Sequence, residues 1–126
     1  MSNLDRFNEI TAKVFADCYS SFPVPLDFCQ SDYIEGVSDA ESDPLFFSTL
    51  EWLKKHGYIS FECQELGWAN YYGVQLTEKG LTALNAVPDA LKEKKTVGDR
   101  VVEVVKTGSK ELMSECIRQI VRATVS

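Results

Sequence analysis

The segment that decides the fold is residues 44–59, PLFFSTLEWLKKHGYI. Its apolar side chains recur at the spacing of an α-helix, at Leu45, Phe46, Leu50 and Leu53. Asp43 can cap this helix and Pro44 suits its first position, while two lysines and Gly57 are typical of its end. The sequence therefore predicts a helix over residues 44–56 that turns at Gly57 into an extended strand.

Beyond Gly57 the apolar period changes from 3.6 residues to two, which indicates strands. The first strand is expected over residues 58–64, with Ile59, Phe61 and Cys63 on one face, and the second over residues 71–77, with Tyr72, Val74 and Leu76 on one face. Residues 65–70 between them contain a glycine, so the two strands predict a β-hairpin. Thr77 can then cap a helix over residues 78–86, with an apolar side at Leu81, Leu84 and Val87, which Pro88 ends.

Toward the N-terminus, apolar residues at helical spacing predict a helix over residues 3–19. Pro23 and Pro25 force an extended connection after it. Asp27 and Gln30 then have the spacing of a capping box, so a short helix is expected from Asp27 to about residue 34, closed by Gly36.

The C-terminal segment, residues 97–126, carries two apolar stripes that are offset from each other. A break at Gly108 and Ser109 explains the offset, so two helices or one bent helix are predicted. A strand at the valine-rich start is the alternative. The segment could dimerise, pack on its own domain or lie on a membrane surface, and we favour self-association because this much apolar surface rarely stays exposed. The candidate dimerisation residues are Val101, Val105, Leu112, Met113, Cys116, Ile117 and Ile120.

Length and composition place the chain among single globular domains: it has 126 residues, of which 44% are hydrophobic and 25% charged. Four cysteines without a Cys-x-x-Cys pair, and one histidine, predict free thiols in a reducing cytoplasm and no metal site. No secretory signal or membrane span is predicted. No phosphate loop, nucleophile elbow or Cys/His signature occurs, so we expect neither an enzyme nor a cofactor.

Two short patterns carry a family resemblance: LKKHGYI at residues 53–59, and LTEKG at residues 76–80. In these patterns and in the order of its predicted elements, the chain resembles winged helix-turn-helix regulators of the MarR and PadR kind over residues 3–88. The resemblance implies a mainly α fold with a small β-hairpin wing (α+β), followed by the C-terminal helical extension. It also implies that residues 44–56 are the recognition helix, that residues 65–70 are the wing tip, and that DNA is the usual partner.

The charge distribution argues against DNA as the partner. Residues 1–57 carry four cations and ten carboxylates, a net charge of −6, whereas residues 58–126 are neutral with nine of each. DNA readout would depend on Ser48, Lys54, Lys55, Lys92, Lys94 and Lys95. Protein binding would use Glu51, Trp52, Glu65, Leu66 and Trp68, because aromatic side chains bordered by acids suit a protein contact. We therefore predict a regulatory module that binds an unidentified protein, with a DNA-binding regulator as the alternative.

Overall fold

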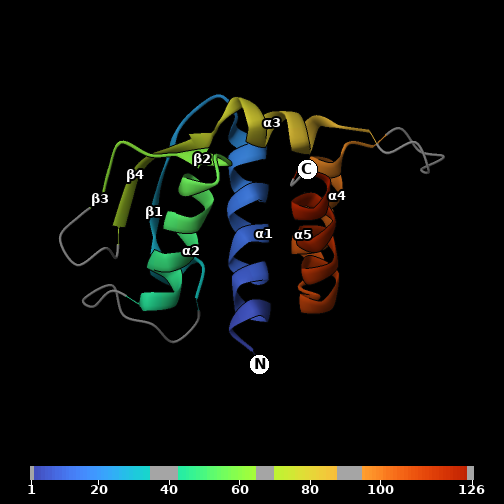
Figure 1. The fold of residues 1–126 in the computed structure, drawn as a ribbon, viewed down its shortest axis with the longest axis horizontal. Coiled ribbons are helices and arrows are strands. Elements are labelled where there is room, and N and C mark those ends of the chain that lie inside the picture. The colour runs from blue at the N-terminus through green and yellow to red at the C-terminus, as the bar shows by residue number, and fades with distance from the viewer. Residues whose placement is uncertain (1, 35–42, 65–69, 88–94, 125–126) are drawn as a thin grey trace.

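The computed structural model describes residues 2–34, 43–64, 70–87 and 95–124. One long helix, α1, runs through the centre of the molecule, with α2 and a small sheet on one side and α4 and α5 on the other (Figure 1). Helix α3 crosses the end where the sheet and the C-terminal helices meet α1 (Figure 1). The elements are α1 (Asn3–Ser21), β1 (Leu26–Cys29), a 3₁₀ helix η1 (Gln30–Asp32), α2 (Pro44–Lys55), β2 (Ile59–Ser60), β3 (Cys63–Gln64), β4 (Asn70–Leu76), α3 (Glu78–Asn85), α4 (Val97–Thr107) and α5 (Lys110–Thr124). The predicted α+β class, mainly helical with a small antiparallel sheet, is confirmed.

Local signals place most helix ends as expected. Asp43 accepts a hydrogen bond from the Leu45 backbone N–H at 2.8 Å, which caps α2 with Pro44 in its first turn. Thr77 accepts from the Gly80 N–H at 3.1 Å and begins α3. The predicted helices over residues 3–19, 44–56 and 78–86 are therefore confirmed to within two residues at each end.

The sheet is antiparallel and β4 is its central strand, with β1 on one side and β2 and β3 on the other. The Glu62 backbone N–H donates to the Tyr72 carbonyl at 3.1 Å, so β2 and β3 follow one edge of β4. This pairing confirms the predicted hairpin strands, but the predicted face of Tyr72 is wrong. The register shifts between Leu26 and Phe28, and Gly73 on β4 has a φ of +68°. This bulge turns Tyr72 outward while its neighbour Tyr71 is fully buried.

The short helix expected from Asp27 to residue 34 is also wrong, because this segment begins as strand β1. Leu26 pairs with Val74 and Phe28 pairs with Tyr71, so the segment gains ladder hydrogen bonds and buries Phe28. The Asp27 carboxylate accepts from the Gly73 N–H at 3.2 Å instead of capping a helix. Long-range pairing therefore overrides the local capping signal, and only the single turn η1 follows. Gly36 lies outside the described residues.

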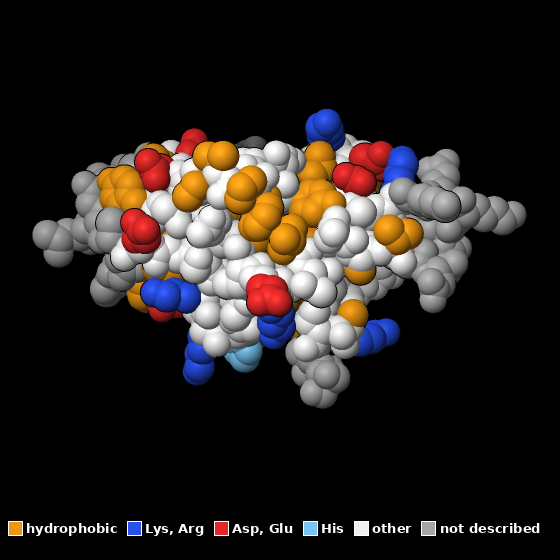
Figure 2. Space-filling model, turned by 90° about the horizontal axis from the view of Figure 1, so that it is seen from above, with side chains coloured by type: hydrophobic (Ala, Val, Ile, Leu, Met, Phe, Trp, Pro, Cys, Tyr) orange, Lys and Arg blue, Asp and Glu red, His pale blue; other side chains and the backbone are white. Residues whose placement is uncertain are grey.

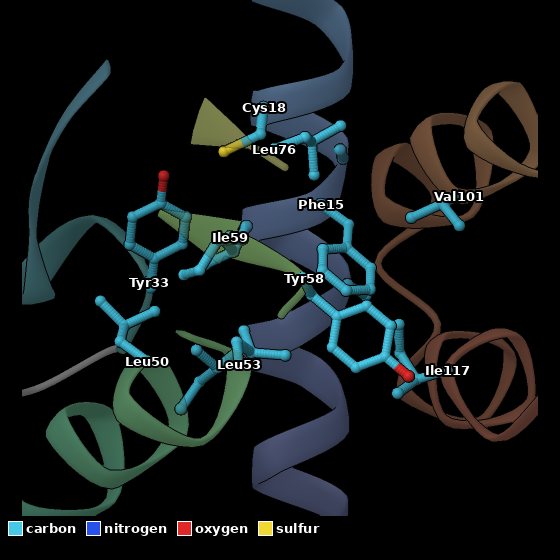
Figure 3. Packing of buried hydrophobic residues seen from close by; sticks show 14 of the residues in the cluster. Phe15, Cys18, Tyr33, Leu50, Leu53, Tyr58, Ile59, Leu76, Val101 and Ile117 are labelled. Atoms are coloured by element: carbon cyan, nitrogen blue, oxygen red, sulfur yellow. The ribbon is translucent and has the colours of Figure 1, made fainter. Parts of the chain in front are cut away.

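The C-terminal segment forms two helices, as predicted, and separates at Gly108, which adopts the left-handed conformation. Both helices pack on α1 of the same chain: the Tyr19 ring lies against Gly98, and Ile117 is fully buried. Figure 3 shows Phe15 and Tyr58 between the α2 side of the core and the side formed by Val101 and Ile117. One continuous core therefore joins residues 3–87 to the C-terminal helices.

Candidate functional site

Helix α2 presents the residues that the sequence singles out, but it does not expose them equally. Ser48, Lys54 and Lys55 are exposed, whereas Glu51 and Trp52 are half-buried. Lys54 lies over the Phe61 ring, with its Nζ 4.3 Å from the ring centroid. This contact directs Lys54 toward the sheet, so Ser48 and Lys55 are the residues of the predicted set that stand free on the outer side of α2.

Trp52 is held by rings on three sides. Its centroid lies 5.3 Å from that of Phe7 in an edge-on arrangement, 4.1 Å from that of His56 and 6.1 Å from that of Tyr58 in stacked arrangements. Such contacts stabilise a fixed orientation of the indole. Trp52 is therefore a rigid, partly accessible aromatic surface rather than a freely moving side chain.

Beside Trp52 lies a groove of about 820 Å³ between α1, α2 and α5, which we call the α1–α2–α5 groove. Its lining comes from three separate segments of the chain. These residues are Asn3, Leu4, Phe7 and Asn8 from α1, Leu45, Ser48, Thr49 and Trp52 from α2, and Ile117, Arg118, Val121 and Arg122 from α5. Trp52 and Ser48, predicted from the sequence for different partners, are thus brought together in one surface.

The charge of this groove is opposite to that of the chain. Arg118 and Arg122 line it, and no carboxylate of the described residues does, although the whole chain carries −6. Arg118 lies 4.0 Å from Glu115 in an exposed pair, which holds it weakly. Within the part of the chain that the structure describes, no carboxylate lies within ion-pair distance of Arg122. The groove therefore combines an apolar floor with two available cations.

The acidic entry to α2 is partly neutralised. Asp43 lies 3.8 Å from the Arg6 guanidinium of α1, in addition to capping α2. At the other end of α2, Figure 2 shows Lys and Arg side chains close to His56 along one edge of the molecule. Lys79 contributes to this edge, since its Nζ donates to the His56 carbonyl at 2.9 Å. The cations at this edge are thus partly engaged in contacts within the chain.

Lys95 is the one remaining predicted binding residue that the structure describes, and it does not line this groove. It pairs with Glu103 of α4 at 2.7 Å. Glu65, Leu66, Trp68, Lys92 and Lys94 lie outside the described residues. The candidate surface therefore consists of residues from α2 and from the helices beside it, α1 and α5.

The candidate dimerisation residues lie mostly inside the chain. Val101, Met113, Cys116, Ile117 and Ile120 are buried, because α4 and α5 turn their apolar stripes onto α1. Val105 is half-buried, and Leu112 is 43% exposed. Packing on its own domain, one of the three possibilities that the sequence leaves open, is thus the arrangement of residues 97–124.

Two further surfaces are apolar. A groove of about 1200 Å³ lies between α3, α4 and α5, where Ala83, Val97 and Ile120 form part of the lining and Arg100 is a cation. Figure 2 shows apolar side chains gathered across the middle of the face that is turned to the viewer. Exposed apolar residues outside the two grooves include Phe22, Val24 and Val87. Helix α5 therefore has an apolar groove on each side.

Two buried titratable groups, Cys18 and Tyr33, do not line the α1–α2–α5 groove. Burial, together with the nearby Asp17 carboxylate, raises the pKa of the Cys18 thiol to about 12. Burial also raises the pKa of Tyr33, and the hydrogen bond that Tyr33 donates to Asp17 at 2.7 Å adds to this shift. These groups stay protonated at neutral pH and act as packing elements.

The described residues hold neither a metal-binding cluster nor a membrane-spanning helix. Within residues 2–34, 43–64, 70–87 and 95–124, no three His, Cys, Asp or Glu side chains gather as a metal ion requires. None of the described helices has the length and apolar character needed to cross a membrane. Cys18, Cys29 and Cys116 are free thiols.

Comparison of the chain with family models, with curated proteins and with solved structures finds no match. The candidate site is therefore defined by the geometry and chemistry of its residues alone. Sequence reasoning missed Leu4, Phe7, Arg118 and Arg122, which come from the two ends of the chain. The available signal was that Leu4 and Phe7 are apolar neighbours one helical turn apart, and that Arg118 and Arg122 are cations at the same spacing.

Proposed function

We propose that this chain is a non-enzymatic interaction module of winged-helix architecture that binds a protein partner beside helix α2. The element order supports the architecture: α2 is followed directly by β2, β3 and β4, and β1 pairs with β4 on the opposite side. This order agrees with the resemblance to winged helix-turn-helix regulators over residues 3–88. Free thiols at Cys18, Cys29 and Cys116 support a reducing compartment such as the cytoplasm.

The observation that carries protein binding is the α1–α2–α5 groove beside the outer side of α2. Leu4, Phe7 and Trp52 give it an apolar character, which suits the buried centre of a protein interface. The groove also holds two cations, Arg118 and Arg122, but a surface that binds nucleic acid neutralises several phosphates with clustered cations, and the rest of this lining is uncharged. A protein is therefore the partner that this surface fits best.

A DNA-binding regulator is the second candidate. Ser48 and Lys55 are exposed on the same outer side of α2, at the position of the recognition helix in the resembling family. Glu51 lies among them, and Lys54 is directed to Phe61. Lys55 is then the one lysine of α2 that points to solvent on this side. A single lysine makes DNA the weaker candidate.

Site-specific photo-cross-linking in the cells that produce the protein distinguishes these candidates. A benzoylphenylalanine at position 48 or 55 is expected to form discrete protein adducts, which the Leu4→Glu variant loses. The matched control is position 106, an exposed lysine on α4. Adducts with nucleic acid alone, together with duplex binding that weakens steeply with salt, would support the DNA candidate and refute ours.

Self-association stays a separate proposal. Within residues 97–124, Leu112 and Val105 are the predicted dimerisation residues that retain accessible surface. Light scattering on the full chain tests it, and a dimer is expected to be weakened by Leu112→Glu. A monomer at all concentrations would refute it.

A further inference from the structure

We infer that the α1–α2–α5 groove receives an amphipathic α-helix of the partner, apolar on one side and acidic along the edge that faces α5. This inference rests on the proposed function, since it requires that the partner be a protein. It adds the secondary structure and the charge of the segment that binds. The groove geometry, its exposed apolar side chains and its two arginines carry the argument.

The secondary structure follows from the walls of the groove. All three walls are helices, and the residues that line the groove fall within 3–8, 45–52 and 117–122. At 1.5 Å per residue, these walls are about 8–11 Å long, which is about one and a half to two turns. Beyond the first turns of α1 and α2, the helical walls satisfy their backbone groups internally, and none of the three offers a strand edge to an extended peptide. A bound helix satisfies its backbone internally and would complete a four-helix arrangement with α1, α2 and α5.

The apolar side of the partner follows from the groove surface. Leu4 is 63% exposed and lines the same groove as Phe7 and Trp52, so three apolar side chains meet there. Phe7 and Trp52 are held edge-on to each other and provide a rigid surface against which aliphatic side chains can pack. A wall about two turns long accommodates apolar anchors at positions i, i+3, i+4 and i+7 of a helix.

The acidic edge follows from Arg118 and Arg122. They lie one helical turn apart on α5, on the rim of a groove whose described lining holds no carboxylate. Asp or Glu residues one turn apart on a docked helix would face both guanidinium groups. A basic helix would meet the same two cations and be repelled.

A second copy of this chain is a poorer occupant. A symmetric dimer brings the same surface patch of two copies together. If that patch were this groove, Arg118 and Arg122 would lie near their own counterparts, where like charges are unfavourable. The charge pattern thus favours a different, acidic chain.

Selection from a displayed library tests the inference without a known partner. The probe is a phage library of helices of about 14 residues, or four turns, with apolar residues fixed at i, i+3, i+4 and i+7 and all other positions randomised. It is selected on the full-length protein and depleted on the Leu4→Glu variant. We expect enriched clones to carry Asp and Glu beside the apolar stripe. Enrichment of basic or uncharged helices, or of none that distinguish the variant, would overturn the inference.

The charge contribution is then measured with the best clone as a fluorescent synthetic peptide. Fluorescence anisotropy is expected to show about tenfold or greater weakening for Arg118→Glu combined with Arg122→Glu. The matched control is Arg100→Glu combined with Lys106→Glu, which changes the net charge equally but lies outside this groove. Equal weakening by both pairs would assign the effect to net charge and overturn the inference.

The apolar contribution has its own matched control. Leu4→Glu is expected to abolish peptide binding. Val24→Glu, which changes an aliphatic residue outside this groove that is 62% exposed against 63% for Leu4, is expected to leave peptide binding within twofold. Circular dichroism of both variants checks that they fold. Loss of binding in both, or in neither, would contradict the assignment of the groove.

The proposed function and this inference fail in different ways. Cross-linking at positions 48 and 55 detects a protein partner of any chemistry, whereas the library detects only a helix. Protein adducts without binding of acidic helices would leave the function and overturn this inference. Absence of protein adducts would remove the function, and this inference with it.

Discussion

The packing of α4 on α1 can be tested at Gly98. A Cβ atom at this position would lie 2.6 Å from three atoms of the Tyr19 ring. Ordinary carbon contacts are about 3.5–4.0 Å, so the ring or the helix would have to move by about 1 Å. The ring is held in place, because the Tyr19 hydroxyl is hydrogen-bonded to Thr96 at 2.8 Å and to Asn85 at 3.3 Å.

The expected magnitude for Gly98→Ala is the difference between two effects. Overpacking costs about 1–3 kcal/mol in the free energy of unfolding. Replacing a helical glycine by alanine stabilises by up to about 1 kcal/mol. The difference is a net loss of about 0–3 kcal/mol, with about 1.5 kcal/mol at the middle of this range, measured by urea unfolding followed by circular dichroism.

A double-mutant cycle with Tyr19→Ala isolates the contact. Without the ring, Gly98→Ala is expected to be neutral or stabilising. If Gly98→Ala alone stabilises the protein by about 1 kcal/mol, as at an exposed helical glycine, α4 does not pack on Tyr19. The apolar stripe of α4 would then be available to a partner, as the sequence first indicates.

Three further variants test other parts of the fold. Tyr33→Phe is expected to lose about 1 kcal/mol of stability, because its hydroxyl donates to Asp17, and unchanged urea unfolding would contradict this. Thr96→Ala removes the capping box of α4 and is expected to cost about 1 kcal/mol by the same assay, so a neutral result would exclude this cap as a stabilising element. Because the pKa of the Cys18 thiol is raised from 9.0 to about 12, its contribution to stability is complete below pH 9 and falls as the pH rises from 9 to 12. We expect this thiol to lower the free energy of unfolding by about 1.4 kcal/mol between pH 8 and pH 10. The free energy of unfolding of Cys18→Ala is therefore expected to fall less over this range. Equal slopes in the two proteins would refute this prediction.

The helices could be predicted from the sequence where their ends are determined by adjacent residues. Asp43 and Thr77 cap the helices that directly follow them, and Gly108 separates α4 from α5. In each case the deciding interaction lies within about four residues of the helix end, so a single sequence contains it.

The errors arise where a distant segment decides the local structure. Asp27 has a plausible capping partner nearby, yet β4 lies more than 40 residues later and draws the segment into a strand. The bulge at Gly73 reverses the expected face of Tyr72 for the same reason, because it depends on the register against β1. Alternation along one strand cannot reveal a shift that its neighbour imposes.

The candidate site likewise contains residues that could be predicted from one helix and residues that depend on distant segments. Trp52 and Ser48 could be selected on α2 alone, since helical spacing separates its outer side from its buried side. Leu4 and Val121 can be recognised as apolar residues of their helices, but their proximity could not be predicted, because it follows from how α1 and α5 pack. The groove is a product of tertiary structure built from the two ends and the middle of the chain.

The apolar content of α5 explains why the sequence predicts that this segment binds a partner. It also explains why the accessible apolar surface in the structure differs from the stripe predicted from the sequence. Ile117 is fully buried within the chain, which accounts for one apolar stripe. Val121 and Ala123 lie to either side of this stripe and line the two grooves that flank the helix. Helix α5 is therefore more apolar than its packing within the described part of the chain requires. This accessible apolar surface lies in both grooves: Val121 is beside Arg118 and Arg122, and Ala123 is in the groove that α5 shares with α3 and α4. Because Ile117 is used inside the chain, these grooves are where α5 still offers apolar surface, and self-association through residues 97–125 stays a prediction.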